Sequence, residues 1–250
     1  MAAVAAVTLL ATQNLSRSFG GLRAVDSVDF SLPAGEVRAI IGPNGAGKTT
    51  FVSLICGRIK ADAGSVVFDG EDISQLAAHR RVTRGIAYTF QITSIFGNLT
   101  AFDNVALAAQ NSMQRRTEVF RPVETTELST RVHQALGQVG LAARAGQRAS
   151  DLAYGHQRLL EVAMGLALSP KLLILDEPTQ GLSDAESAAF CELLRKLAGK
   201  ATVLLIEHNM SVVMAVADRI TVMNAGRILS EGTPEEIRAD DAVKRAYLGT

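Results

Sequence analysis

Apolar and polar side chains alternate in two stretches near the start of the 250-residue chain, residues 7–12 and 25–32. This alternation predicts two antiparallel strands, with Gly20-Gly21 in the turn between them. A third short run, residues 65–68, ends at Asp69-Gly70, a dipeptide typical of tight turns. The first quarter of the chain is therefore expected to form an antiparallel sheet.

Other apolar runs do not alternate. Residues 37–41, 172–175 and 202–206 are almost entirely aliphatic, which predicts strands buried on both faces. Residues 86–90 read as a further strand, and 220–223 with 227–229 as a hairpin.

Helical periodicity fills most of the remaining chain. The expected helices are 50–56, 102–110, 128–139, 159–168, 185–197 and 211–217. Another begins at Thr233, with Pro234 in the first position and Glu236 reaching back to the cap. Residues 111–126 are polar and read as a surface connection. We expect one α/β domain in which residues 1–87 and 166–250 form the sheet core and 88–165 form a helical insertion.

Composition narrows the class of protein. Lys plus Arg and Asp plus Glu number 25 each, so no net charge attracts the chain to nucleic acid. No apolar run approaches the roughly 20 residues that span a bilayer, and residues 1–7 lack the positive charge of a signal peptide. Cys56 and Cys191 have no metal-ligand partners at motif spacing, so they are expected to be reduced core residues.

Residues 42–50 read Gly-Pro-Asn-Gly-Ala-Gly-Lys-Thr-Thr, between a predicted buried strand and a predicted helix. This is the strand–loop–helix setting of a phosphate-binding loop. Its glycines let successive N–H groups face a polyphosphate, Lys48 would reach the β- and γ-phosphates, and the Thr49 hydroxyl would hold Mg²⁺. The nucleotide-binding residues expected from the loop are Asn44, Gly45, Ala46, Gly47, Lys48, Thr49 and Thr50. The sequence therefore predicts that the protein binds ATP or another nucleoside triphosphate with Mg²⁺.

Two adjacent carboxylates, Asp176 and Glu177, follow the aliphatic run 172–175. Alone they would more often be a solvated strand end, but an upstream phosphate loop favours catalysis. Neighbouring strand residues point to opposite sides, so the two carboxylates serve different purposes. We expect Asp176 to hold Mg²⁺ and Glu177 to polarise the attacking water.

Two further polar residues follow predicted strands. His208, after the run 202–206, could be a structural hydrogen-bonding residue or could donate to the γ-phosphate. Gln91, after the strand 86–90, could ligate Mg²⁺ and orient water. We expect both to contribute to catalysis.

The segment Leu152-Ala153-Tyr154-Gly155-His156-Gln157 resembles a divergent form of the LSGGQ signature of ATP-binding cassette (ABC) ATPases. The other motifs stand in the order that this family shows, so the resemblance covers essentially the whole chain. It implies a P-loop NTPase core with an antiparallel β subdomain and an inserted α-helical subdomain. It also implies a head-to-tail dimer, in which each ATP lies between the phosphate loop of one subunit and the signature segment of the other.

The resemblance assigns further residues. Phe19 matches the aromatic side chain that stacks on adenine, with Val25 beside it. Ala153, Tyr154, Gly155, His156 and Gln157 would face the nucleotide of the partner subunit. Ala153 stands where most relatives carry a serine, which removes one hydroxyl contact to the γ-phosphate, and Ser183 stands where many carry an aspartate.

Several phrases are similar to the branched-chain amino acid (Liv-type) importers, among them Phe19-Gly20-Gly21-Leu22, Ile206-Glu207-His208-Asn209-Met210 and Ala246-Tyr247-Leu248-Gly249. That likeness implies integral-membrane permease subunits, a second ABC ATPase that is identical or a paralogue, and indirectly an external solute-binding protein. The chain would then lie on the cytoplasmic face of the bacterial inner membrane. A permease helix would dock beside Gln91, on residues such as Ile92, Ile95, Phe96 and Leu99, although these four could equally be internal packing.

Three other functions are compatible with parts of this sequence. One is export of lipid or lipopolysaccharide, because the cytoplasmic ATPase subunits of such exporters look much like those of the importers. A soluble ABC protein acting on DNA or ribosomes is less favoured, because the chain has one cassette, no heptad run and no basic patch. A regulator without useful hydrolysis is disfavoured by the presence of both Glu177 and His208.

Overall fold

The structure is a computed structural model that describes residues 7–89, 94–114, 125–197 and 201–248. The chain forms two compact units. The first unit contains Met1–Val82 and Ala198–Thr250, and the second contains Thr83–Leu197. The expected helical insertion at 88–165 stays a prediction.

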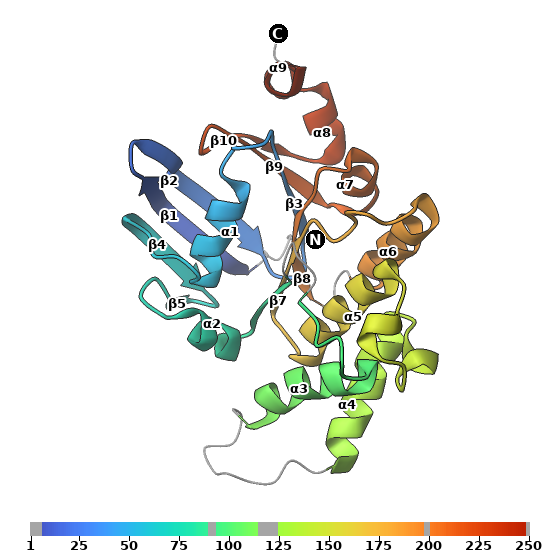
Figure 1. The fold of residues 1–250 in the computed structure, drawn as a ribbon. Coiled ribbons are helices and arrows are strands. Elements are labelled where there is room, and N and C mark those ends of the chain that lie inside the picture. The colour runs from blue at the N-terminus through green and yellow to red at the C-terminus, as the bar shows by residue number, and fades with distance from the viewer. Residues whose placement is uncertain (1–6, 90–93, 115–124, 198–200, 249–250) are drawn as a thin grey trace, which may run out of the picture. The chain divides into compact units, whose positions relative to one another are not determined.

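The first unit contains an antiparallel sheet near the start of the chain (Figure 1). Its strands are β1 (Thr8–Phe19), β2 (Leu22–Pro33), β4 (Ala63–Phe68) and β5 (Glu71–Asp72), in the order β2-β1-β4-β5. The turn at Gly20-Gly21 is confirmed, and Gly20 adopts φ +56° there. β1 and β2 are longer than the alternation predicts, because irregular pairing between Thr12 and Leu15 interrupts the period of two.

Parallel strands in the same unit carry the phosphate loop. β3 (Val37–Ile41) pairs in parallel with β8 (Thr202–Ile206) and with β9 (Arg219–Asn224), and β10 (Arg227–Gly232) is antiparallel to β9. Every residue of β3 and β8 is buried, as their aliphatic sequences predict. The hairpin of β9 and β10 is also confirmed.

The helices of the first unit are α1 (Lys48–Cys56), α2 (Ala78–Arg84), α7 (Met210–Val216), α8 (Pro234–Ala239) and α9 (Asp241–Leu248). The capping box is confirmed, since the Thr233 and Glu236 side chains each accept a hydrogen bond from the other's backbone N–H. Sequence reasoning missed α2. This helix buries Arg81, whose guanidinium donates to the backbone oxygens of Leu54 and Ile55, near the end of α1.

The second unit contains two parallel strands, β6 (Ile86–Thr89) and β7 (Leu172–Asp176). Its helices are α3 (Ala101–Gln114), α4 (Thr125–Gln138), α5 (Tyr154–Ala167), α6 (Asp184–Leu197) and two 3₁₀ turns, Ala142–Arg144 and Ala149–Asp151. The helix expected at 159–168 begins earlier, at Tyr154. The capping residue is Ala153, whose side chain cannot accept a hydrogen bond, so the sequence contains no capping signal for this start.

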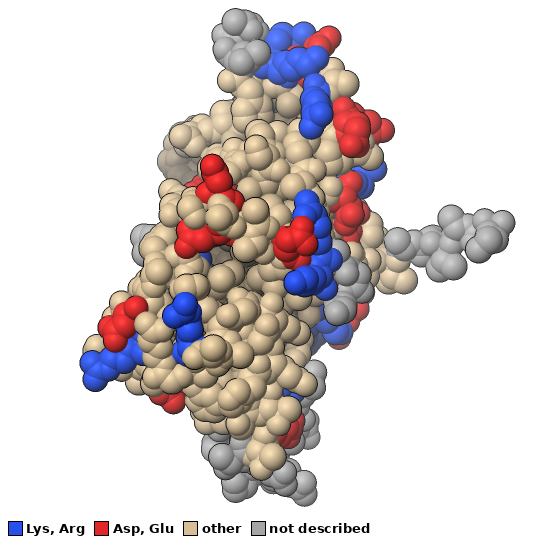
Figure 2. Space-filling model, turned by 90° about the vertical axis from the view of Figure 1, so that its right-hand side faces the viewer, with Lys and Arg blue, Asp and Glu red and all other residues tan. Residues whose placement is uncertain are grey.

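Both cysteines are buried and reduced, as expected. Within the described ranges, no helix is long and apolar enough to cross a membrane. On the face drawn in Figure 2, acidic and basic side chains of the described residues are interspersed rather than gathered by sign. This distribution agrees with a chain whose charges cancel.

Candidate functional site

The phosphate loop follows β3 in the first unit, and its glycines are required by their surroundings. A Cβ atom on Gly42 would lie 2.2 Å from the Met223 backbone oxygen, and one on Gly47 would lie 2.2 Å from the Ala24 backbone oxygen. Gly45 and Gly47 also adopt left-handed backbone angles, φ +80° and +98°. The loop therefore packs its backbone directly against β2 and β9, which fixes the path of its N–H groups.

Lys48 begins α1 and is 6% exposed. Its Nζ donates to the backbone oxygens of Gly42, at 2.7 Å, and Pro43, at 3.0 Å. The first turn of α1 contains no acidic residue, so the positive end of the helix dipole adds to the lysine charge. A loop of N–H groups with this charge is an anion site suited to phosphate.

An exposed aromatic ring lies at the end of β1. Phe19 is 46% exposed, and the Arg17 guanidinium carbon lies 4.9 Å from its ring centroid. Asp62 pairs with Arg17 at 2.7 Å and thereby fixes the guanidinium over the ring. One face of Phe19 is thus supported by a cation, and the ring is available for a flat, electron-rich base. Val25 is fully buried in β2, and its expected contact with adenine stays a prediction.

His208 follows β8, the strand that pairs in parallel with β3. Because the carboxyl ends of parallel neighbours share one edge, His208 and the phosphate loop leave the sheet on the same side. Glu207 is buried, and its carboxylate accepts the backbone N–H groups of His208 and Asn209 at 2.9 and 3.1 Å. His208 itself is exposed, on a backbone that Glu207 holds in place.

In the second unit, Asp176 is the last residue of β7 and is 1% exposed. The Tyr88 hydroxyl, on β6, donates to its Oδ2 at 2.7 Å. Sequence reasoning missed Tyr88, because only strand pairing shows that the two side chains meet. Glu177 comes next and adopts φ +49°, a left-handed conformation that is strained for a residue with a side chain. Such strain at a carboxylate is a feature of functional sites.

The signature segment begins α5, also in the second unit. Ala153 is the capping residue and makes no side-chain hydrogen bond, whereas the Gln157 amide donates to the Leu152 backbone oxygen at 3.0 Å. Tyr154 is 45% exposed, and the Arg158 guanidinium carbon lies 5.5 Å from its ring centroid. His156 is half-buried in the first turn of the helix.

The loop after β7 touches this segment. Glu186 accepts hydrogen bonds from the Ser183 N–H at 2.9 Å and from the Ser183 hydroxyl at 2.8 Å, and these two bonds hold its pKa below the ordinary value. A Cβ atom on Gly155 would lie 2.2 Å from the Glu186 Oε1 atom. A larger side chain at position 155 would have to displace the Glu186 carboxylate, which is a physical reason for a glycine there. Sequence reasoning missed Glu186.

A cavity of about 160 Å³ opens beside β6 and α5 in the second unit. Glu161 lines it, accepts the Ser94 N–H at 2.5 Å and pairs with Arg158 at 3.1 Å. Burial raises the pKa of Glu161 despite these partners. Of the four residues expected to meet a partner helix, Phe96 is 55% exposed, Ile95 and Leu99 are half-buried, and Ile92 lies outside the described residues. Gln91 also lies outside them.

The donor chemistry is compatible with Mg²⁺. Within the described ranges, no three His, Cys, Asp or Glu side chains cluster in a metal-binding arrangement. Mg²⁺ is commonly held by one or two protein oxygens together with phosphate oxygens. Thr49 and Asp176 each offer a hard oxygen ligand of this kind, one in each unit.

Comparisons with known proteins agree with these features. A family model described as ABC transporter matches residues 25–180, and one described as branched-chain amino acid ATP-binding cassette transporter matches residues 227–250. The chain is 38% identical over 250 residues to the high-affinity branched-chain amino acid transport ATP-binding protein LivG of Escherichia coli K12, covering 96% of this chain and 98% of LivG. It is 33% identical over 249 residues to the lipopolysaccharide export system ATP-binding protein LptB of Haemophilus influenzae, covering 97% and 98%.

Solved structures share the fold. The ADP conformation of MJ1267, an ATP-binding cassette of an ABC transporter, superposes with a TM-score of 0.86 at 29% identity. The match covers 98% of this chain and all of that one, 100%. The similarity therefore extends over both units.

Proposed function

The chain belongs to the ABC transporter family of ATP-binding cassettes, and we propose that it is the ATP-hydrolysing subunit of an importer for branched-chain or related amino acids. The observation that carries the proposal is the likeness to LivG along nearly the whole chain, extended by the separate match of residues 227–250. The residues of each unit supply chemistry that fits this activity.

Nucleotide binding is assigned to the first unit. The loop N–H groups of Asn44 to Thr50 and the Lys48 ammonium receive the phosphates, because they form an anion site at a helix start. The Phe19 ring stacks on the adenine, and Val25 is assigned as the apolar contact beside it. Thr49 and Asp176 are assigned as oxygen ligands of Mg²⁺, with Gln91 as a further ligand. Bound Mg²⁺ supplies neutralisation of phosphate charge.

Hydrolysis is assigned to the residues that follow three of the parallel strands. Glu177, whose backbone adopts the left-handed conformation at φ +49°, accepts a proton from the attacking water. His208 donates a hydrogen bond to the γ-phosphate, from the edge where the phosphate loop also emerges. Gln91 orients the water.

The signature segment is assigned to contact with a second cassette, which is either an identical chain or a paralogue. Ala153, Tyr154, Gly155, His156 and Gln157 present the start of α5 to the γ-phosphate bound by the facing subunit. Closure on ATP and reopening after hydrolysis would move the permease. An alanine at position 153 weakens closure by about 1 kcal/mol per site, the value of one neutral hydrogen bond.

The permease would dock on the second unit. Phe96 is exposed on a segment that Asn104 holds by hydrogen bonds to the backbone N–H and C=O of Phe96, at 2.8 and 3.1 Å. Ser94, two residues earlier, lines the cavity with Glu161. An exposed aromatic ring on a segment held by hydrogen bonds suits the apolar face of an amphipathic partner helix. This contact would place the chain on the cytoplasmic face of the inner membrane, with an external solute-binding protein in the same system.

Export of lipopolysaccharide is the second candidate, because LptB of H. influenzae is similar over nearly the same length. Uptake of radiolabelled leucine in host cells decides between them. A chromosomal Glu177→Gln substitution should abolish high-affinity uptake and leave the outer membrane intact. Normal uptake together with a lipopolysaccharide defect would replace the import proposal with the export one.

Affinity isolation of the tagged chain from detergent-solubilised membranes provides a second test. The expected co-purifying proteins are integral-membrane permease subunits and a second cassette. Recovery of ribosomal or DNA-binding proteins in their place would contradict the transport proposal.

A further inference from the structure

The turn between β9 and β10 packs against the phosphate loop. Its two central residues, Ala225 and Gly226, adopt φ +46° and +79°, the left-handed angles of a tight two-residue hairpin turn. The Gly226 N–H donates to the Ala46 backbone oxygen at 3.0 Å. At the start of the loop, a Cβ atom on Gly42 would lie 2.2 Å from the Met223 backbone oxygen. The hairpin therefore contacts the loop at two separate points.

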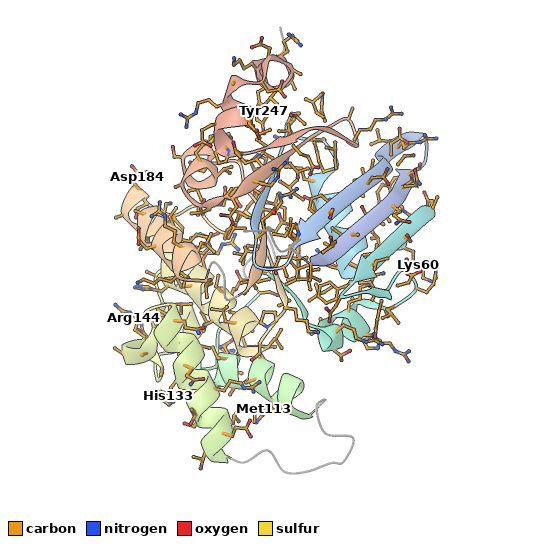
Figure 3. The ribbon with its side chains drawn as sticks, turned by 180° about the vertical axis from the view of Figure 1, so that it is seen from behind. Lys60, Met113, His133, Arg144, Asp184 and Tyr247 are labelled. Carbon is orange, nitrogen blue, oxygen red and sulfur yellow. The ribbon has the colours of Figure 1, made fainter. Side chains whose placement is uncertain are left out.

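The same turn is attached to β2. The Asp26 N–H donates to the Gly226 backbone oxygen at 2.9 Å. A Cβ atom on Gly226 would lie 3.0 Å from the Ala24 backbone oxygen, so the turn and the strand are in close contact. In Figure 3 the tip of this hairpin, drawn in pale red, reaches the blue strands β1 and β2. Gly226 thus links β2 to the loop by one hydrogen bond on each side.

An ion pair restrains the turn beside these backbone bonds. Asp26 is buried, and its Oδ2 atom accepts a hydrogen bond from the Arg227 Nε at 2.7 Å and lies 2.5 Å from the Arg227 Nη2. Its Oδ1 atom accepts a hydrogen bond from Arg23 at 2.8 Å. The bonds from Arg227 and Arg23 hold the pKa of Asp26 below its ordinary value, so the carboxylate is ionised at neutral pH. Because Arg227 directly follows Gly226, this pairing restrains the residue that contacts the loop.

The contact with Ala46 sets the direction of one loop peptide. Its backbone oxygen is turned toward Gly226, which donates to it. Because a trans peptide is planar, the Gly47 N–H of the same peptide points the opposite way, away from the hairpin. A loop that binds phosphate needs its N–H groups, and not its carbonyl oxygens, to face the anion.

We propose that Asp26 and Arg227 are positioning residues for the nucleotide site, because their ion pair keeps the Gly226 N–H on the Ala46 oxygen and thereby preorganises the phosphate loop for the phosphates of ATP and ADP. The β9–β10 hairpin is then part of the phosphate-binding apparatus. This inference rests on the proposed role of residues 44–50.

Three substitutions separate the ion pair from the rest of the fold. Asp26→Asn keeps the size of the side chain and the backbone bonds of Gly226, and it removes only the charge. Arg227→Met removes the guanidinium, and the Arg227 side chain is 70% exposed, so this change opens no core. Asp29→Asn is the matched control, because Asp29 is an exposed residue of the same strand whose carboxylate accepts the Asn14 N–H of β1 at 2.6 Å.

The test measures binding of Mg-ADP and of magnesium tripolyphosphate by titration calorimetry, on the full-length chain. Asp26→Asn and Arg227→Met should each raise both dissociation constants about fivefold. This is less than the full value of a charge-assisted hydrogen bond, because the backbone bonds of Gly226 remain. The KM for ATP should rise by a similar factor with kcat unchanged, and the Gly226 amide proton should exchange faster with solvent. Asp29→Asn should bind both ligands as the natural chain does.

Two further variants test whether the effect comes from the pair. The double variant of Asp26→Asn and Arg227→Met should bind as weakly as either single variant, because both lose the same interaction. Arg227→Lys retains a cation and should bind more tightly than Arg227→Met. Additive losses in the double variant would show that the two residues act separately, and the inference would fail.

Other results would also overturn the inference. These are natural affinity in Asp26→Asn and Arg227→Met, an equal loss in Asp29→Asn, or a loss for Mg-ADP alone, which would concern the base rather than the loop. Lys48→Ala separates the inference from the proposed function. If Lys48→Ala abolishes binding while the two ion-pair variants bind normally, only the role of the pair fails. If the natural chain binds no Mg-ADP, the proposed nucleotide site fails.

Discussion

The Tyr88 hydroxyl donates to the Asp176 Oδ2 atom at 2.7 Å, across the pairing of β6 with β7. The carboxylate at the end of β7 is therefore oriented by the neighbouring strand before any ligand arrives. A carboxylate that is 1% exposed needs such a donor, because an unsatisfied buried acceptor is costly.

Tyr88→Phe should consequently lower the free energy of unfolding by about 1.5–3 kcal/mol, the range for a hydrogen bond to a charged group. The KM for Mg²⁺ should also rise, since Asp176 loses its fixed orientation. Urea unfolding and the Mg²⁺ dependence of ATP turnover measure the two effects. Tyr154→Phe is the stability control, because Tyr154 is 45% exposed. Equal stability of Tyr88→Phe and the natural chain would remove Tyr88 from this role.

Glu177→Gln should keep ATP binding and reduce turnover by about 100-fold or more, the usual contribution of a general base. The substitution preserves the size of the side chain and removes only its ability to accept a proton. Phosphate release under saturating ATP provides the rate, and calorimetry provides the affinity. Hydrolysis close to the natural rate would assign the base to another residue.

Ala153→Ser should strengthen ATP-dependent association of two cassettes. In a Glu177→Gln background, which retains ATP, one restored hydrogen bond per site corresponds to about 1 kcal/mol, and two sites to about 2 kcal/mol. The dimer dissociation constant should fall by roughly 30-fold. Sedimentation with ATP measures this constant, and sedimentation without ATP should show no difference. A dimer unchanged by the serine would argue that position 153 does not face the nucleotide.

Ser183→Ala should produce a pH-dependent loss of stability. The Ser183 N–H and hydroxyl lower the pKa of Glu186 from 4.5, so their stabilising effect is present above pH 4.5 and is lost as pH falls through the lowered pKa. The variant loses the hydroxyl contribution, so its urea midpoint should be lower than the natural one at pH 7. The difference should vanish in acid, once Glu186 is protonated in both proteins. A difference independent of pH would mean that Ser183 acts through packing instead.

The sequence allowed the phosphate loop, the buried strands and the capping box at Thr233 to be predicted, because each depends on local chemistry. Glycine spacing, aliphatic runs and Thr-Pro-Glu-Glu report backbone geometry directly. The signature at residues 152–157 and the resemblance to branched-chain amino acid importers could also be identified from the sequence. The comparisons confirm the family.

Contacts between segments far apart in the chain could not be predicted from the sequence. Tyr88 meets Asp176 only because strand pairing brings the two residues together. Helix α2 escaped prediction because it shows no apolar periodicity and buries only Arg81. The alanine cap of α5 hid the start of that helix in a similar way.

The Glu186 side chain contacts two segments of the second unit. Its carboxylate accepts two hydrogen bonds from Ser183 and also occupies the space beside Gly155. The loop after β7 and the first turn of α5 are therefore connected through one side chain. A displacement of Ser183 would therefore reach the first turn of α5 through the Glu186 side chain.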